Sequence, residues 1–101
     1  MESKRWFIYL TFGTLKKKMR EKEREKEREK FEEKTKIVLS KIVERRKNLN
    51  ITQAALALKL NMSFSGYFKV ETGKTKLDTR RLLQVLDILE ISPKDFFKDF
   101  E

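Results

Sequence analysis

The sequence has no cysteine and no histidine, and it contains only three glycines and one proline. Without cysteine the chain can form no disulfide, thiolate metal site or thiol nucleophile. Without histidine it has no imidazole for acid–base chemistry. Three glycines also leave no glycine-rich loop that could hold a phosphate. These absences argue against an enzyme, and we expect no metal site and no bound cofactor.

Long apolar stretches are missing as well. The longest one, residues 6–10, is far shorter than the roughly 20 apolar residues that a membrane-spanning helix needs. It follows Lys4 and Arg5, as the apolar part of a signal peptide would, but no small-x-small cleavage site comes after it. We therefore expect a cytoplasmic protein without a membrane partner.

The charge is strongly basic and unevenly distributed. The formal net charge is +9. Residues 37–81 hold ten Lys/Arg and three Asp/Glu, which gives +7, whereas residues 82–101 hold two against five, which gives −3. Such a balance favours polyanionic partners, nucleic acid before an acidic membrane surface, although basic surfaces also serve solubility.

The chain divides into three segments. Residues 1–14 form an apolar, aromatic arm that favours a β-strand. Because a lone strand is unstable in water, the arm packs on its own domain, pairs with another copy or is disordered. Residues 15–36 carry an Arg-Glu-Lys-Glu repeat that favours helix but lacks the apolar seam of a coiled coil. We expect a solvated helix that runs into the next one, with a disordered tether as the alternative.

Residues 37–101 have the pattern of a folded all-α core with five short helices. Apolar residues at helical spacing predict a first helix from Ile37, and a nearly all-apolar run over residues 82–89 predicts a central, buried fourth helix. The dipeptide Ser92-Pro93 is a typical helix start, and we expect the fifth helix to present Phe96, Phe97 and Phe100 as its apolar face.

Residues 52–73 predict two short helices joined by a tight turn. Thr52 and Ser63 are suited to cap their N-termini, and Asn61 between them enters a left-handed turn at little cost. Ala57 lies where the two helices approach most closely. This stretch resembles the helix-turn-helix of the lambda-type repressor and Cro (Xre) family, on the following residues: Gln53, Ala57, Ser63, Val70, Glu71, Gly73 and the tail from Leu82-Leu83 to Phe96-Phe97.

The resemblance covers about residues 37–97 and implies a five-helix, lambda-repressor-like DNA-binding domain. It implies a structural pair between Arg46 and Glu71. It also implies contacts to DNA phosphates by Gln53 and Ser63, by the loop Gly73–Lys76 through backbone amides and basic side chains, and by nearby basic residues. The candidate basic side chains are Lys74, Lys76, Arg80 and Arg81.

The resemblance further implies a recognition helix from Phe64 to about Glu71, with base-reading side chains at Phe64, Ser65, Phe68 and Lys69. None of these is arginine, glutamine or asparagine, the residues that make bidentate contacts to guanine or adenine. Phe64 and Phe68 could contact thymine methyl groups, fold back into the core, or form an apolar patch for a protein partner.

Two functions follow from these features. The first is a sequence-specific transcriptional regulator of the repressor type that binds double-stranded DNA as a homodimer, with residues 6–12 in the dimer interface. The second is a protein-interaction module or antitoxin-type component on the same scaffold, whose partner is a toxin or another regulator.

Overall fold

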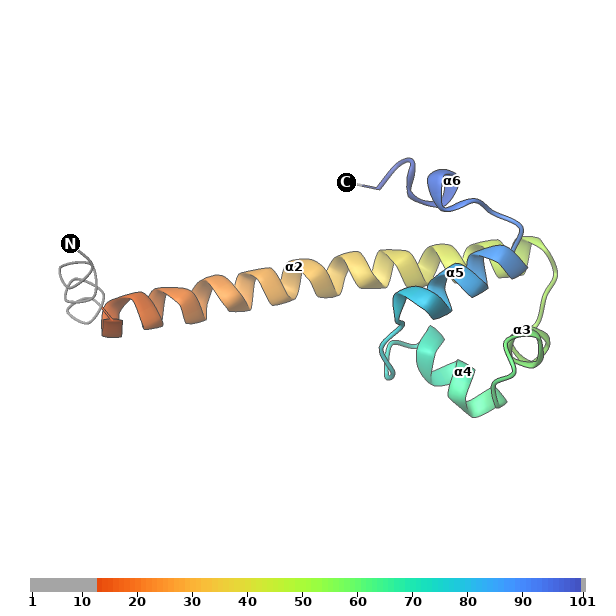
Figure 1. The fold of residues 1–101 in the computed structure, drawn as a ribbon, viewed down its shortest axis with the longest axis horizontal. Helices are drawn as coiled ribbons and strands as arrows, with labels where there is room; N and C mark the ends of the chain where they lie inside the picture. Colours follow the sequence, from red (N-terminus) through yellow and green to blue (C-terminus); the bar gives the residue numbers. More distant parts are fainter. Residues whose placement is uncertain (1–12, 101) are drawn as a thin grey trace. The chain divides into compact units, whose positions relative to one another are not determined.

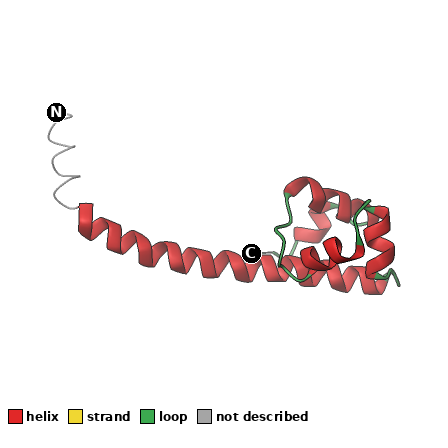
Figure 2. Cartoon of the chain, turned by 90° about the horizontal axis from the view of Figure 1, so that it is seen from below, coloured by secondary structure: helices red, strands yellow, loops and turns green. Residues whose placement is uncertain are grey.

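The computed structural model describes residues 13–100, with side chains from residue 20 onward. These residues form five helices and no strand (Figures 1 and 2): α2 (Gly13–Asn48), α3 (Gln53–Lys59), α4 (Phe64–Glu71), α5 (Thr79–Ile88) and α6 (Pro93–Phe97). The expected all-α fold is confirmed. The apolar residues 6–12 lie outside the described part of the chain, whereas Gly13 and Thr14, which were assigned to the same arm, begin α2.

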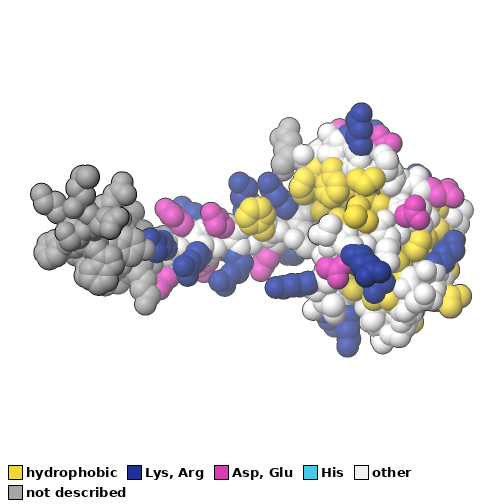
Figure 3. Space-filling model, viewed as in Figure 1, with side chains coloured by type: hydrophobic (Ala, Val, Ile, Leu, Met, Phe, Trp, Pro, Cys, Tyr) yellow, Lys and Arg dark blue, Asp and Glu magenta, His cyan; other side chains and the backbone are white. Residues whose placement is uncertain are grey.

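The chain divides between Lys34 and Thr35 into two units. In the first unit, residues 20–33 of α2 are all exposed, and basic and acidic side chains are interspersed along the helix (Figure 3). The Lys34 ammonium lies 5.8 Å from the centre of the Phe31 ring. Because this part of α2 has no apolar face to bury, its helicity rests on the helix propensity of Glu, Lys and Arg.

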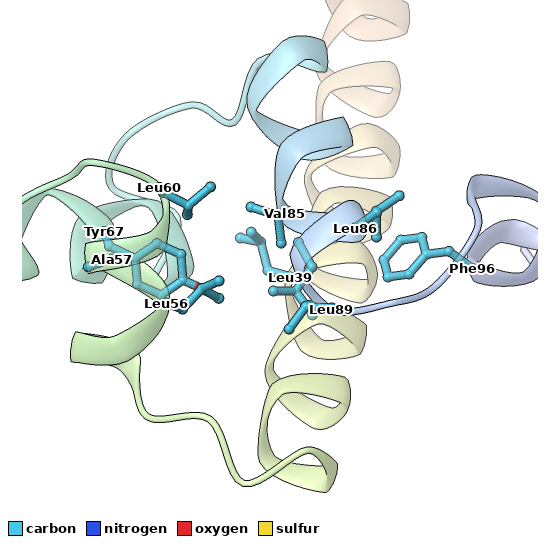
Figure 4. Close-up of a cluster of buried hydrophobic side chains, with 10 residues drawn as sticks. Leu39, Leu56, Ala57, Leu60, Tyr67, Val85, Leu86, Leu89 and Phe96 are labelled. Atoms are coloured by element: carbon cyan, nitrogen blue, oxygen red, sulfur yellow. The ribbon is translucent and has the colours of Figure 1, made fainter.

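The second unit has one hydrophobic core to which all five helices contribute (Figure 4). Its ten buried members are Leu39, Ile42, Leu56, Ala57, Leu60, Tyr67, Val85, Leu86, Leu89 and Phe96. Burial of each large apolar side chain contributes about 1.5–3 kcal/mol to folding. The core therefore holds α3 and α4 against α2 and α5.

Each of the four helices after α2 begins with a side-chain cap. In each case the side-chain oxygen of the cap accepts a hydrogen bond from a backbone amide three residues later, and these bonds measure 3.0, 3.0, 2.7 and 3.1 Å. The caps are Thr52, Ser63, Asp78 and Ser92. Asp78 is the cap of α5, and the helix starts at Gln53, Phe64 and Pro93 are confirmed.

Two apolar residues near the C-terminus differ from the sequence-based expectation. Leu83 is 49% exposed, because the core-facing stripe of α5 follows the i, i+3, i+4, i+7 spacing of Leu82, Val85, Leu86 and Leu89 and leaves Leu83 outside it. Phe100 lies beyond α6, in a turn closed by its amide on the Phe97 carbonyl (3.0 Å). Its ring packs edge-to-face on Phe97, with centroids 5.5 Å apart.

Basic side chains of α2 bind the carbonyl groups at the ends of α5 and α6. Arg45 donates to the carbonyls of Leu89 (2.9 Å) and Glu90 (3.1 Å). Lys41 donates to the Phe96 carbonyl and lies 4.9 Å from the centre of the Phe96 ring. Since the last carbonyls of a helix have no partner within it, these bonds satisfy groups that would otherwise need water.

The second residue after each of α2, α3 and α5 turns the chain through a left-handed backbone conformation. Asn50, Asn61 and Glu90 have φ of 57°, 55° and 57°. Asparagine tolerates this conformation, whereas a glutamate there is strained by its Cβ. Of the three residues, Glu90 is therefore the one whose side chain is unfavourable in the left-handed conformation that the fold requires.

Replacement of Glu90 by glycine should stabilise the second unit. We expect Glu90→Gly to raise the free energy of unfolding by about 0.5–1 kcal/mol, because glycine removes the left-handed strain at a modest entropic cost. Urea denaturation followed by circular dichroism measures the change. The matched control is Glu44→Gly at an exposed position inside α2, which should lower stability by about 1 kcal/mol. A loss of stability in Glu90→Gly would contradict the assignment of strain.

Candidate nucleic-acid interface

The helix-turn-helix is built by α3, a left-handed turn and α4. The Met62 amide closes the turn by donating to the Ala57 carbonyl at 2.9 Å, and the Ala57 side chain is 1% exposed. The requirement for glycine at position 66 is also local, because a Cβ there would lie 2.9 Å from Ser63 Oγ. That oxygen is the cap of α4, so a side chain at position 66 would displace the group that begins the helix.

The two faces of α4 differ in burial. Tyr67, Val70 and Glu71 are buried and hold the helix on the core. The four positions expected to read bases lie on the opposite, exposed face: Phe64, Ser65, Phe68 and Lys69. The structure therefore presents together the side chains that the sequence singled out for base contacts.

Phe64 and Phe68 form a stacked pair on this exposed face. They are 54% and 40% exposed, and their ring centroids lie 6.3 Å apart with an interplanar angle of 21°. Neither ring folds back into the core. Two adjacent exposed aromatic rings on one helix form an apolar patch on the surface of the domain.

A buried ion pair fixes the position of α4. Arg46 of α2 donates to both carboxylate oxygens of Glu71, with Nη2–Oε1 at 2.8 Å and Nε–Oε2 at 3.2 Å. The Arg46 and Glu71 side chains are only 8% and 4% exposed. Arg46 also donates to the Ile51 carbonyl (2.9 Å), which joins the end of α2 to the same group. The structural pair implied by the resemblance is thus present, in bidentate geometry.

Gln53 is the third member of this network. Its side-chain amide donates to Glu71 Oε1 at 3.0 Å, a contact that the sequence did not indicate. An amide has two N–H donors, so this bond holds the side chain and leaves the second donor for another acceptor. Gln53 at the start of α3 is therefore positioned by the same carboxylate that fixes α4.

The network keeps Glu71 ionised. Burial alone would raise the pKa of Glu71, but its polar neighbours, above all the bonds and positive charge of Arg46 and with Gln53 among the others, outweigh burial and hold that pKa below its usual value. Burial raises the pKa of Tyr67 far above the ordinary range, and the neighbouring negative charge of Glu71 raises it further. The Tyr67 hydroxyl stays protonated and has no hydrogen-bond partner among the described residues.

The loop after α4 differs from what the resemblance implied. The amide of Gly73 donates to the Val70 carbonyl (3.1 Å), and the amides of Lys74 and Thr75 donate to the Lys69 carbonyl (2.8 and 3.1 Å). Three of the expected phosphate donors in this loop are therefore bonded within the protein, because the loop closes the C-terminal end of α4. The side chains of Lys74 and Lys76 are exposed and carry the positive charge of the loop.

The remaining candidates for phosphate contacts divide into exposed and half-buried groups. Arg80 and Ser63 are exposed. Arg81 is half-buried, and its Nη1 donates to the Leu60 carbonyl (3.1 Å) and to Gln84 Oε1 (3.3 Å). Arg81 therefore satisfies the C-terminal end of α3 in addition to any role at the surface.

The comparisons with known proteins agree with this geometry. A helix-turn-helix family model matches residues 42–96, slightly more than half of the chain. The chain belongs to the Xre-type helix-turn-helix family. It is 37% identical over 59 residues to the "Uncharacterized HTH-type transcriptional regulator y4aM" of Sinorhizobium fredii (strain NBRC 101917 / NGR234). These residues make up 58% of this chain but 41% of that protein, so the chain spans less than half of its relative.

No solved structure matches the chain. Within residues 13–100, no group of three or more acidic, cysteine or histidine side chains could hold a metal ion. No helix of the same part of the chain is long and apolar enough to cross a membrane.

The charges around the helix-turn-helix are almost all positive. Residues 52–77 contain four lysines and a single acidic residue, Glu71. Because Glu71 is buried against Arg46, no acidic side chain of this stretch balances the exposed lysines, which are Lys59, Lys69, Lys74 and Lys76. Lys59 was not among the contacts expected from the sequence. Its signal there is that it is the one charged residue of α3.

Removal of one partner of the Arg46–Glu71 pair should destabilise the fold more than removal of both. We expect Arg46→Met and Glu71→Leu each to lower the free energy of unfolding by about 3–5 kcal/mol. The first variant leaves the buried Glu71 carboxylate without its counter-ion, and the second leaves the buried Arg46 guanidinium without its acceptor. The double variant should lose less than either single variant. Urea denaturation of the three proteins, with the wild type, measures these changes. A double variant whose loss equals the sum of the single losses would show that the two side chains act independently.

Proposed function

We propose that this protein is a sequence-specific DNA-binding transcriptional regulator of the repressor type. It binds double-stranded DNA as a homodimer, and each copy places α4 in the major groove of one half of a pseudo-palindromic site. The observation that supports this most directly is the exposed face of α4, which lies on the helix-turn-helix and is followed by a loop with the exposed side chains of Lys74 and Lys76. The printed name of the relative, an HTH-type transcriptional regulator, agrees with it.

The candidate side chains fall into two groups. Phe64, Ser65, Phe68 and Lys69 contact base edges. Phosphate contacts come from Gln53 through its second amide proton, from the Ser63 hydroxyl, and from these basic side chains: Lys74, Lys76, Arg80 and Arg81. Phosphate contacts fix the register of the protein on the duplex, while base contacts select the sequence.

The alternative function is supported by the exposed Phe64–Phe68 pair. An apolar patch of this kind also suits a protein partner, such as a toxin or another regulator. The two functions differ in their dependence on salt, because contacts to phosphate release counterions and apolar contacts do not.

Binding to duplex DNA over a range of salt concentrations tests the proposed function. A random duplex pool first yields the preferred sequence by repeated selection, and a gel shift then measures its affinity. About six phosphate contacts predict a log–log slope of about −5 with salt. A homodimer predicts two half-sites whose centres lie about 10–10.5 base pairs apart. Failure of the pool to enrich any sequence, together with a flat salt dependence, would overturn the proposal.

Lys69→Ala and Gln53→Ala should weaken binding in different ways. Lys69 is the only long donor on the exposed face of α4, so its loss should weaken binding to the selected sequence by about 1–3 kcal/mol and relax preference at one or two base pairs. Gln53→Ala should weaken the selected and unrelated duplexes alike, since a phosphate contact carries no sequence information. Competition gel shifts with both duplexes measure each effect. A uniform loss in Lys69→Ala would make Lys69 a phosphate contact.

A further inference from the structure

The exposed face of α4 lacks the side chains that usually read base edges. No arginine, glutamine or asparagine occurs between Phe64 and Glu71. The hydrogen-bonding groups on this face are the Ser65 hydroxyl, which lies 3.5 Å from Ser63 Oγ, and the Lys69 ammonium. Most of the remaining exposed surface belongs to two phenylalanine rings.

The thymine C5-methyl is the only sizeable apolar group that a base pair presents in the major groove. Hydrogen-bond donors and acceptors line the rest of the groove, whereas thymine presents its C5-methyl group. A phenylalanine ring can replace the water around this methyl group without leaving a polar atom unpaired. The chemistry of the Phe64–Phe68 pair therefore complements a methyl group and does not complement a base edge without one.

The separation of the two rings fits more than one methyl group. Their centroids lie 6.3 Å apart, and successive base pairs are spaced by about 3.4 Å along the duplex. The pair thus extends over one to two base steps and can contact methyl groups on neighbouring base pairs. Because residues four apart on a helix lie on the same side, both rings approach the groove together.

We propose that Phe64 and Phe68 form a reader of pyrimidine C5-methyl groups. This inference rests on the proposed DNA-binding function and specifies its ligand: a thymine, or a cytosine methylated at C5, at adjacent or next-but-one positions of the binding site. The recognised group is the methyl itself. A cytosine at such a position becomes a favourable contact when C5 methylation adds the group that unmodified cytosine lacks.

The charge around the pair favours DNA over a protein as the partner. Lys69 follows Phe68 in α4 and is exposed as well, and the exposed Lys74 and Lys76 follow in the next loop. The acidic residue nearest in sequence, Glu71, is buried against Arg46. An apolar pair that is accompanied by exposed lysines matches the major groove, where methyl groups lie between rows of phosphates.

The test compares duplexes that differ only in methyl groups. The probes are the duplex selected from the random pool, versions with single thymines replaced by deoxyuridine, and a pair with cytosine or 5-methylcytosine at the sensitive position. Removal of one contacted methyl should weaken binding by the wild-type protein about fourfold, and removal of two by about 15-fold. 5-Methylcytosine should bind about fourfold more tightly than cytosine.

Variants assign the effect to the two rings. Phe64→Ala and Phe68→Ala should bind the thymine probe more weakly and should lose the difference between thymine and deoxyuridine at one position each. Leu58→Ala is the matched control, because Leu58 is 77% exposed on α3 and lies outside α4. It should keep the full difference. Circular dichroism of each variant shows whether its helices are intact.

The outcomes separate this inference from the proposed function. Enrichment of a sequence whose binding changes less than twofold at every deoxyuridine position would overturn the methyl reader and leave the regulator in place. The same holds if both phenylalanine variants keep the wild-type difference. Unchanged DNA binding by the two variants would assign the patch to a protein partner and would also overturn the inference. Failure to enrich any sequence would overturn both proposals.

Discussion

The buried ion pair between Arg46 and Glu71 determines how this domain presents its surface. It joins α2 to α4 through two hydrogen bonds at 2.8 and 3.2 Å, and both side chains are less than a tenth exposed. Two buried charges are tolerated only when each is paired and hydrogen-bonded. The bidentate geometry and the added bonds to the Ile51 carbonyl and from Gln53 meet that condition. As a consequence, the position of α4 is tied to α2 and to the start of α3.

The same carboxylate links the two groups that the proposed function needs. Glu71 holds α4, whose outer face carries the proposed base contacts, and it also holds Gln53, a proposed phosphate contact at the start of α3. A shift of either helix would disturb the bonds to the other. The proposed register on the phosphates and the proposed reading of bases are therefore coupled through one buried group, although neither Arg46 nor Glu71 is exposed to a partner.

Local features of the fold were predictable from the sequence, while tertiary ones were less so. Caps such as Ser63 and Ser92, and the left-handed Asn61, act within a few residues of themselves, so their patterns specify the structure directly. The Arg46–Glu71 pair came from the resemblance. The Gln53–Glu71 bond and the internal bonding of the amides of residues 73–75 depend on how helices meet and how a loop closes. No periodicity in the sequence encodes those contacts.

The burial of one face of α4 in the core also explains how two phenylalanines could serve as base contacts in the proposed complex. Apolar contacts have no preferred direction, so a flexible helix that carried them would slide along the groove and gain little selectivity. Here Tyr67, Val70 and Glu71 hold the opposite face of α4 in the core, and the two rings are stacked on each other. In the proposed complex the position of the rings would then be set by the protein, and selectivity would come from where they are held.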